Sequence, residues 1–217
     1  MDVSITVGGV ELPGEFVHPD MATAAVIFAH GSGSSHQSPR NRRVADELRV
    51  AGFATLLFDL LTAAEGLDRR LVFDVQRLTD RLVAATDWLR EQQAWEGRIG
   101  YFGASIGSAA ALSAAARLPE HVGAVVSRGG RPDLVGQSNL ARLTAPTLLI
   151  VGGDDPLVQA VNEDVDRILR AEHRLEVIPG ATHLFEEAGA MERVTQLAVD
   201  WYRRYLGTDE NAPTPGG

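Results

Sequence analysis

The chain has 217 residues, of which 45% are hydrophobic and 23% charged, the mixture expected of one soluble globular domain. It carries 20 Lys and Arg against 29 Asp and Glu, so its formal net charge is −9, and we expect no nucleic-acid partner because a negative chain repels phosphate backbones. Cysteine is absent, which excludes disulfides, thiolate nucleophiles and cysteine-based metal sites.

No signal peptide is visible at the N-terminus, and no stretch approaches the length of a membrane-spanning helix. We therefore expect a cytoplasmic protein without membrane contact. A single domain is expected over residues 1–207, followed by a disordered tail over the polar, Pro- and Gly-rich residues 208–217. The sequence is compatible with a homodimer but does not decide the oligomeric state.

The first predicted elements are two strands, 2–7 and 10–17, that flank the hairpin signal Gly8-Gly9. The apolar run AAVIFA at 24–29 predicts a buried strand. Helices and strands then alternate: a helix over 39–51, a strand over 53–58, a long helix over 71–93, a strand over 98–103, a helix over 105–117, a strand over 122–127, a weaker helical segment over 133–143, a strand over 146–151, a helix over 157–171, a strand over 174–178 and a helix over 191–206.

Strands separated by helices require crossover connections, which predict an α/β fold with a mostly parallel sheet and helices on both faces. Ligands of such sheets bind at the carboxyl ends of the strands. Few residues are available for a lid between the strand that ends near Val126 and the next one, so we expect a minimal lid or none. The loop 59–70 is expected to border the site.

A candidate nucleophile lies where the strand over 98–103 gives way to a helix. The sequence Gly103-Ala104-Ser105-Ile106-Gly107 has the G-x-S-x-G pattern of a strained turn that exposes a serine hydroxyl above a sheet. The alternative is that Ser105 merely caps the helix. The strand-turn-helix context favours the nucleophile.

A serine hydroxyl needs a neighbouring base. In folds that expose the serine on such a strand-turn-helix, called the nucleophile elbow, the acid and then the histidine follow the serine in the chain. His183 is the favoured base because it lies in the loop after the last predicted strand, at the carboxyl edge. His121 enters a strand and is expected at the surface. His173 precedes a strand and therefore lies at the wrong edge of the sheet.

Two neighbouring aspartates, Asp154 and Asp155, follow the strand over 146–151 and are candidates for the acid that orients the histidine. Asp133, after the preceding strand, is a third. The alternative role of Asp155, which precedes Pro156, is that of a helix N-cap, and capping and catalysis need not exclude each other. Position and spacing alone do not separate Asp154 from Asp155.

The amide of Ile106, directly after the nucleophile, is expected to bind the developing oxyanion. A second amide is expected from the Gly- and Ser-rich loop that follows the strand over 24–29, with Ser32 as first choice and Gly33 as the alternative. This loop also makes His30 and Gly33 candidate substrate contacts. A phosphate-binding role is disfavoured because the loop lacks the lysine of a P-loop.

Two arginines, Arg128 and Arg131, follow the strand over 122–127 at the same edge of the sheet. They are candidate contacts for a substrate carboxylate. The alternatives are that they pair with nearby acids such as Asp133 or face solvent.

Four motifs in this order resemble the dienelactone-hydrolase-like branch of the α/β-hydrolase superfamily: HGSGSS at 30–35, GASIG at 103–107, GGDDPLV at 152–158 and GATHLF at 180–185. The resemblance implies a small single-domain hydrolase of esters or lactones. It also selects Asp155, the fourth residue of the family's G-x-x-D-x-x-V pattern. Dienelactone hydrolases proper use a cysteine, so the version with Ser105 resembles a general esterase.

The sequence therefore predicts a serine hydrolase of small acyl esters with a Ser105, His183 and Asp155 triad, and with no cofactor or metal. Its expected partner is a small-molecule acyl substrate. The alternatives are an acyltransferase or peptidase with the same triad, and a ligand-binding protein of this fold without catalysis.

Overall fold

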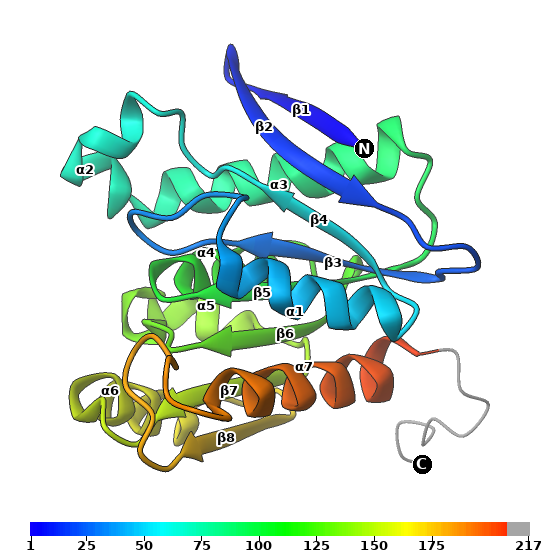
Figure 1. Cartoon of the computed structure of the whole chain (residues 1–217). Helices are drawn as coiled ribbons and strands as arrows, with labels where there is room; N and C mark the ends of the chain where they lie inside the picture. The colour runs from blue at the N-terminus through cyan, green and yellow to red at the C-terminus, as the bar shows by residue number, and fades with distance from the viewer. Residues whose placement is uncertain (208–217) are drawn as a thin grey trace.

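The structure, a computed structural model, describes residues 1–207; the predicted tail over 208–217 lies outside the described residues. Its sheet has eight strands in the order β1-β2-β4-β3-β5-β6-β7-β8 (Figure 1). Strands β3 to β8 are parallel, and the hairpin of β1 and β2 pairs with β4 in antiparallel fashion. The bounds are β1 Asp2–Val7, β2 Val10–Val17, β3 Ala24–Ala29, β4 Ala54–Phe58, β5 Arg98–Ala104, β6 Val122–Arg128, β7 Thr147–Gly152 and β8 His173–Ile178.

The hairpin turns at Gly8 and Gly9, whose φ angles are 59° and 81°. Positive φ at both central residues characterises the tight turn that matches the twist of two antiparallel strands. Val7 and Val10 are accordingly cross-strand partners, as the sequence predicted.

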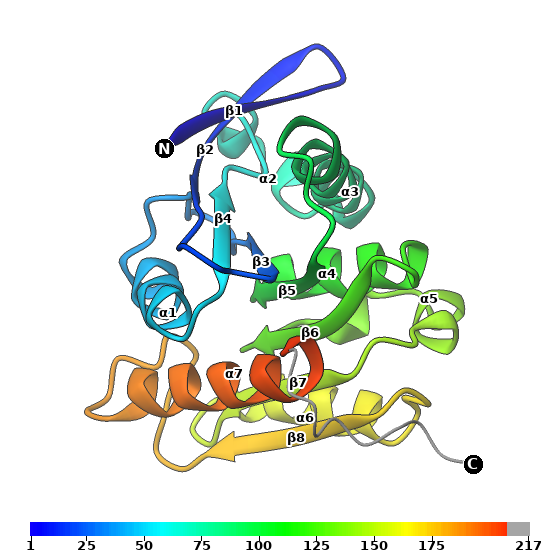
Figure 2. The ribbon, with the colours of Figure 1, turned by 90° about the vertical axis from the view of Figure 1, so that its right-hand side faces the viewer.

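Helices cover both faces of the sheet (Figure 2). Helices α3, α4, α5 and α6 pack on one face, where Leu78, Leu82 and the alanines of α4 join the apolar core. Helices α1 and α7 pack on the other face, with Val44, Leu48 and Tyr202 among the buried contacts. The helices are α1 Pro39–Val50, α2 Arg69–Val72, α3 Val75–Gln92, α4 Ile106–Arg117, α5 Gln137–Arg142, α6 Pro156–Asp166 and α7 Ala190–Leu206, with two short 3₁₀ turns, η1 Glu65–Leu67 and η2 Pro132–Leu134.

Three predicted helices differ from the structure. The helix expected over 71–93 is divided into α2 and α3, because Asp74 caps α3 by accepting the Arg77 N–H at 3.1 Å. The segment over 133–143 divides into η2 and α5, and the helix expected over 157–171 ends at Asp166. The spacing of hydrophobic residues continues through each of these helix ends. A prediction from that spacing therefore does not find them.

The sheet topology brings the loops after six strands to one edge. Ser105 follows β5 at the centre of the sheet, and the segments after β3, β4, β6, β7 and β8 surround it. Only η2 and α5 lie between β6 and β7, so the expectation of a minimal lid is confirmed. None of the helices within residues 1–207 is long and apolar enough to cross a membrane.

Candidate active site

The backbone of Ser105 is strained. The residue has φ 51° and ψ −121°, an unfavourable conformation for a side chain with a Cβ. Its N–H donates to the Arg128 carbonyl at 3.1 Å, and its own carbonyl accepts the Ser108 N–H at 3.0 Å. These hydrogen bonds hold the turn between β5 and α4 in place. The Ser105 backbone therefore keeps its strained conformation, in which the hydroxyl stands above the edge of the sheet.

The two glycines of the G-x-S-x-G motif make this turn sterically possible. A Cβ on Gly107 would lie 2.2 Å from the Ala29 carbonyl oxygen, and one on Gly103 would lie 2.5 Å from the Ser108 Cα. Both contacts are with backbone atoms that have no freedom to move away. The motif therefore reflects close packing of α4 against β3 and the elbow.

The structure brings together Ser105, His183 and Asp155, which come from the ends of three different strands. His183 Nε2 lies 3.3 Å from the Ser105 Oγ, and His183 Nδ1 lies 2.7 Å from Asp155 Oδ2. A carboxylate only accepts hydrogen bonds, so the proton sits on Nδ1 and is donated to Asp155. That leaves Nε2 free to accept the hydroxyl proton of Ser105.

Asp154 faces solvent and does not reach the imidazole; its N–H donates to the Ala181 carbonyl at 2.9 Å. Asp155 occupies the N-cap position of α6, as its place before Pro156 suggested, but its side chain forms no capping hydrogen bond. Its carboxylate is directed to His183 instead. A Cβ on Gly152 would lie 2.3 Å from the Ala181 carbonyl oxygen, so the loops that carry the acid and the base pack against each other.

The two other downstream histidines lie outside the site, as expected. His121 accepts a hydrogen bond from Arg90 at 2.8 Å, and His173 begins β8 at the amino edge of the sheet. Asp133 forms an ion pair with Arg131 and does not contact His183.

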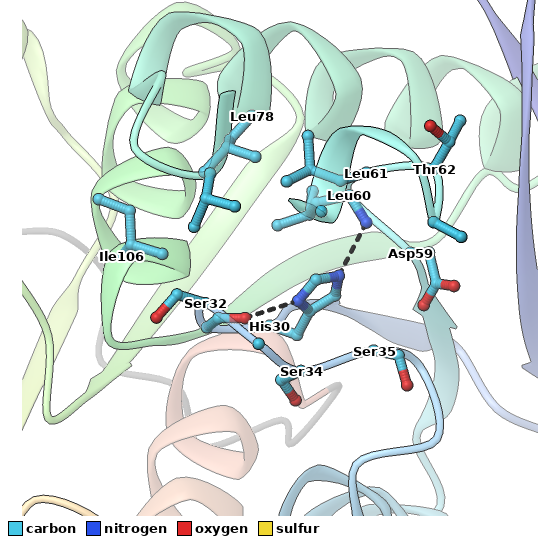
Figure 3. A pocket seen from close by; sticks show the side chains of 15 residues that line it. His30, Ser32, Ser34, Ser35, Asp59, Leu60, Leu61, Thr62, Leu78 and Ile106 are labelled. Atoms are coloured by element: carbon cyan, nitrogen blue, oxygen red, sulfur yellow. Dashed lines mark hydrogen bonds between the residues drawn. The ribbon is translucent and has the colours of Figure 1, made fainter. Parts of the chain in front are cut away.

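His30 fixes the loop after β3. The ring is buried, its Nδ1–H donates to the Gly31 carbonyl at 2.9 Å, and its Nε2 accepts the Leu60 N–H at 2.9 Å (Figure 3). Burial lowers the pKa of His30, and a neutral ring with one donor and one acceptor satisfies both contacts. With both nitrogens engaged, His30 ties the loop after β3 to the loop after β4 and has no free nitrogen for a substrate.

This contact sets the direction of the next amide. The Gly31 carbonyl also accepts the Ser34 N–H at 3.3 Å, which fixes the Gly31–Ser32 peptide plane. In a trans peptide the Ser32 N–H points opposite to that carbonyl. A Cβ on Gly31 would lie 3.2 Å from the Ala104 carbonyl oxygen and from the Ser105 Cβ, so the loop abuts the elbow.

Two small cavities flank the loop of residues 31–34. The first, of about 230 Å³, is lined by the loop of residues 30–35, including Gly33 (φ 66°), and by apolar side chains from the neighbouring elements (Figure 3). The apolar side chains are Leu60, Leu61, Ala63, Val72, Leu78 and Ile106, and the polar side chains of Asp59 and Thr62 also line this cavity. The second, of about 130 Å³, is lined by Ser105, His183, Arg128, Arg40 and neighbouring residues. We call them the apolar cavity and the arginine cavity; both include Gly31, Ser32 and Ser34.

The two arginines predicted as substrate contacts differ in environment. Arg131 binds Asp133 through two hydrogen bonds of 2.8 and 2.7 Å and lines neither cavity, so the structure does not bring it to the site. Arg128 lines the arginine cavity beside Ser105. Arg40 and Asn41 also line it. The sequence alone assigned neither of them a role; both lie in the first turn of α1, which begins at Pro39.

Within residues 1–207, no three His, Asp or Glu side chains are grouped so that they could hold a metal ion. The groups that lie around Ser105 are the His183 imidazole, the Asp155 carboxylate and the backbone amides of the neighbouring loops.

Residues 22–201 match the family model described as "Alpha/beta hydrolase domain". A dienelactone hydrolase from Anabaena variabilis is 55% identical, with a TM-score of 0.91 over 95% of this chain and 97% of that one. The chain belongs to the α/β-hydrolase family, in its dienelactone-hydrolase-like branch. The fold predicted from the sequence and the predicted family resemblance are confirmed.

More distant α/β hydrolases share the fold alone. Est1E from Butyrivibrio proteoclasticus is 16% identical, with a TM-score of 0.75 over 92% of this chain and 98% of that one.

Proteins of two Mycobacterium tuberculosis strains, provisionally named phosphoribosyl transferases, are 50% identical over 206 residues, which cover 94% of this chain and 46% of theirs. This α/β-hydrolase chain spans less than half the length of those relatives, so their name describes much longer proteins.

Proposed function

We propose that this protein is a serine hydrolase that cleaves small acyl esters through an acyl-enzyme on Ser105. The observation that carries the proposal is the hydrogen-bonded series from Ser105 Oγ to His183 and from His183 to Asp155. This arrangement turns a weakly nucleophilic hydroxyl into one whose proton has an acceptor in place. The 55% identity to a dienelactone hydrolase supports hydrolysis of an acyl compound.

In the first half-reaction, Ser105 Oγ bonds to the acyl carbon and its proton passes to His183 Nε2. The amides of Ile106 and Ser32 stabilise the resulting oxyanion. When the tetrahedral intermediate collapses, the ester C–O bond breaks and His183 gives its proton to the departing alcohol. Asp155 stabilises the imidazolium throughout but is not itself protonated.

In the second half-reaction, water attacks the acyl-enzyme and transfers a proton to His183. Collapse of the second intermediate breaks the bond between the acyl group and Ser105 Oγ, which recovers the proton from His183. The products are a carboxylic acid and an alcohol, and the triad returns to its starting state.

The test is turnover of p-nitrophenyl acetate and butyrate by the wild type, Ser105→Ala and Ser113→Ala. Ser113 is buried in the same helix, α4, and lines neither cavity, so its variant controls for loss of a hydroxyl. We expect Ser105→Ala to abolish turnover and Ser113→Ala to retain it. Equal turnover by wild type and Ser105→Ala would refute the proposal. A wild type that turns over neither ester and takes up no serine-directed phosphonate would favour a ligand-binding protein.

A further inference from the structure

The loop that carries the Ser32 amide has little rigidity of its own. Residues 31–35, which we call the oxyanion loop, are two glycines and three serines. Gly33 adopts a φ of 66°, and the hydrogen bond from the Ser34 N–H to the Gly31 carbonyl is long, at 3.3 Å. Glycine-rich backbone loses much conformational freedom when it is ordered, whereas an oxyanion donor is effective only when it is held in place beforehand. The loop therefore needs contacts at both of its ends.

His30 anchors the first end of the oxyanion loop, and His36 anchors the second. The N–H of His36 donates to Asp59 Oδ1 at 2.6 Å, and the ring Nδ1 of His36 lies 2.8 Å from the same oxygen. Because a carboxylate oxygen only accepts hydrogen bonds, Nδ1 carries a proton and is the donor. The two contacts fix both the backbone and the ring of the residue that follows the loop.

Asp59 is itself held by the sheet. It directly follows β4, and its N–H donates to the Pro13 carbonyl of β2 at 2.9 Å. The Asp59 and His36 side chains are 18% and 16% exposed, so water competes only partly for the hydrogen bonds between them. The next residue, Leu60, is the partner of His30, so adjacent residues after β4 hold the two ends of the loop. Figure 3 shows Asp59 beside Ser35, at the other end of the loop from Ser32.

We propose that His36 and Asp59 form a clamp on the far end of the oxyanion loop, so that both are positioning residues for the Ser32 amide in catalysis. The inference rests on the proposed function, in which that amide stabilises the oxyanion. Asp59 lines the apolar cavity, but neither side chain lines the arginine cavity, which contains Ser105. The clamp therefore acts on the reaction through the loop backbone, and its loss leaves the loop anchored at His30 alone.

The test removes the acceptor of the clamp and then restores it. Asp59→Ala deletes the oxygen that binds both donors, whereas the amide oxygen of Asp59→Asn can still accept from both. On p-nitrophenyl butyrate we expect Asp59→Ala to lower kcat by about 10- to 100-fold with a smaller change in KM. Asp59→Asn should stay within about fivefold of the wild type. Wild-type kcat in Asp59→Ala, or equal losses in the two variants, would overturn the clamp.

The control is Asp166→Ala, which removes the carboxylate from another pair of a histidine and an aspartate. His173 Nε2 lies 3.6 Å from Asp166 Oδ1, and this pair lies where α6 ends and β8 begins, at the amino edge of the sheet. We expect Asp166→Ala to have the kcat of the wild type. A loss comparable to that of Asp59→Ala would show that the position of the carboxylate does not matter, and would overturn the clamp.

A transition-state analogue separates positioning of the amide from loss of folded enzyme. With butyl trifluoromethyl ketone, Ser105 Oγ adds to the carbonyl carbon, the hydroxyl proton passes to His183, and the carbonyl oxygen becomes an oxyanion. We expect the inhibition constant in Asp59→Ala to rise by the same factor by which kcat/KM falls. A fall in kcat/KM with an unchanged inhibition constant would indicate less active protein rather than a displaced amide, and would overturn the clamp.

A second variant covers the case in which Asp59→Ala does not fold. His36→Ala removes the ring contact but keeps the backbone N–H, so we expect kcat to fall by about three- to tenfold. Where both variants fold, the double variant should be no slower than Asp59→Ala, because both substitutions break the same contact, and additive losses would overturn the clamp. Wild-type kcat in His36→Ala would overturn it too and leave the hydrolase intact, whereas a wild type without ester turnover would overturn the proposed function itself.

Discussion

His183 Nδ1 lies 2.7 Å from the Oδ2 of Asp155, while the adjacent Asp154 is exposed and binds the Ala181 carbonyl through its backbone. The two neighbouring carboxylates therefore have different surroundings although they follow the same strand. Only the second of them is placed to fix the tautomer of the imidazole and to stabilise its protonated form.

Substitution of the two aspartates should separate them. We expect Asp155→Asn to lower kcat by about 10³- to 10⁴-fold, because an amide at this position favours the wrong tautomer of His183. Asp154→Asn should remain within about threefold of the wild type, as expected for an exposed side chain away from the reacting atoms. Steady-state kinetics on p-nitrophenyl butyrate measure both, and similar losses in the two variants would contradict the assignment.

The His30 ring should matter for the rate although it has no free nitrogen for substrate. His30→Ala removes the two contacts that fix the Gly31 carbonyl and the Leu60 amide, so the Ser32 amide loses its set direction. We expect kcat to fall by about 10- to 100-fold with a smaller change in KM, less than the loss expected when an oxyanion donor is deleted outright.

The control for this variant is His121→Ala, since His121 lies at the opposite edge of the sheet. Reaction rates and thermal melting should be measured on both. A His30→Ala enzyme with wild-type kcat would show that the ring does not position the loop.

Gly107, two residues after the nucleophile, should not tolerate an added methyl group. Because a Cβ on Gly107 would lie 2.2 Å from the Ala29 carbonyl oxygen, Gly107→Ala has to displace α4 or β3. We expect a loss of about 3 kcal/mol or more, seen as a Tm lowered by about 6 °C or more or as insoluble protein.

Gly136→Ala is the control for that steric argument, because Gly136 has negative φ and an added Cβ would find no atom closer than 4.0 Å. Its Tm should stay close to that of the wild type in calorimetry. If Gly107→Ala melts at the wild-type temperature, the close packing at the elbow is refuted.

Glu65 should make a pH-dependent contribution to stability. Hydrogen bonds from Arg81, and then from Thr62, outweigh burial and lower the pKa of Glu65 from 4.5 to about 2. A carboxylate with a depressed folded-state pKa stabilises the fold above its unfolded pKa, and this contribution is lost as the pH falls towards 2. Its upper limit is about 3 kcal/mol.

Urea unfolding of the wild type and Glu65→Gln at several pH values checks this. We expect the variant to be less stable at pH 7, with a difference in unfolding free energy that shrinks below about pH 4.5. Glu47→Gln, at an exposed position of α1, should show no such trend. A difference that stays constant down to about pH 2 would contradict the assigned role of the charge.

The sequence predicts the order of the strands and helices because alternating apolar runs and amphipathic segments persist along the chain. It fails where a single polar side chain ends a helix. At Asp74 the hydrophobic spacing continues, yet the carboxylate accepts the Arg77 N–H and starts a new helix. Helix ends of this kind depend on a side-chain conformation that spacing does not encode.

The candidate site shows the same limit. Ser105 and His183 were recognisable because their position relative to strands is a property of the chain order. Arg128 and Arg131 are equivalent in the sequence, and only the folded chain shows that Arg131 is paired with Asp133, whereas Arg128 is buried and its Nε has no hydrogen-bond partner within residues 1–207. Arg40, in α1, lines the arginine cavity together with Arg128. No local sequence pattern predicts that these two distant segments meet.

The most direct test of the central claim is the site at which a serine-directed reagent is attached. The protein should be treated with a fluorophosphonate, its intact mass measured and the modified residue mapped by peptide sequencing. The account predicts one label per chain, on Ser105, with labelling slowed strongly in His183→Ala and absent in Ser105→Ala. Equal labelling of Ser105→Ala and the wild type, or a label mapped to another serine, would contradict it.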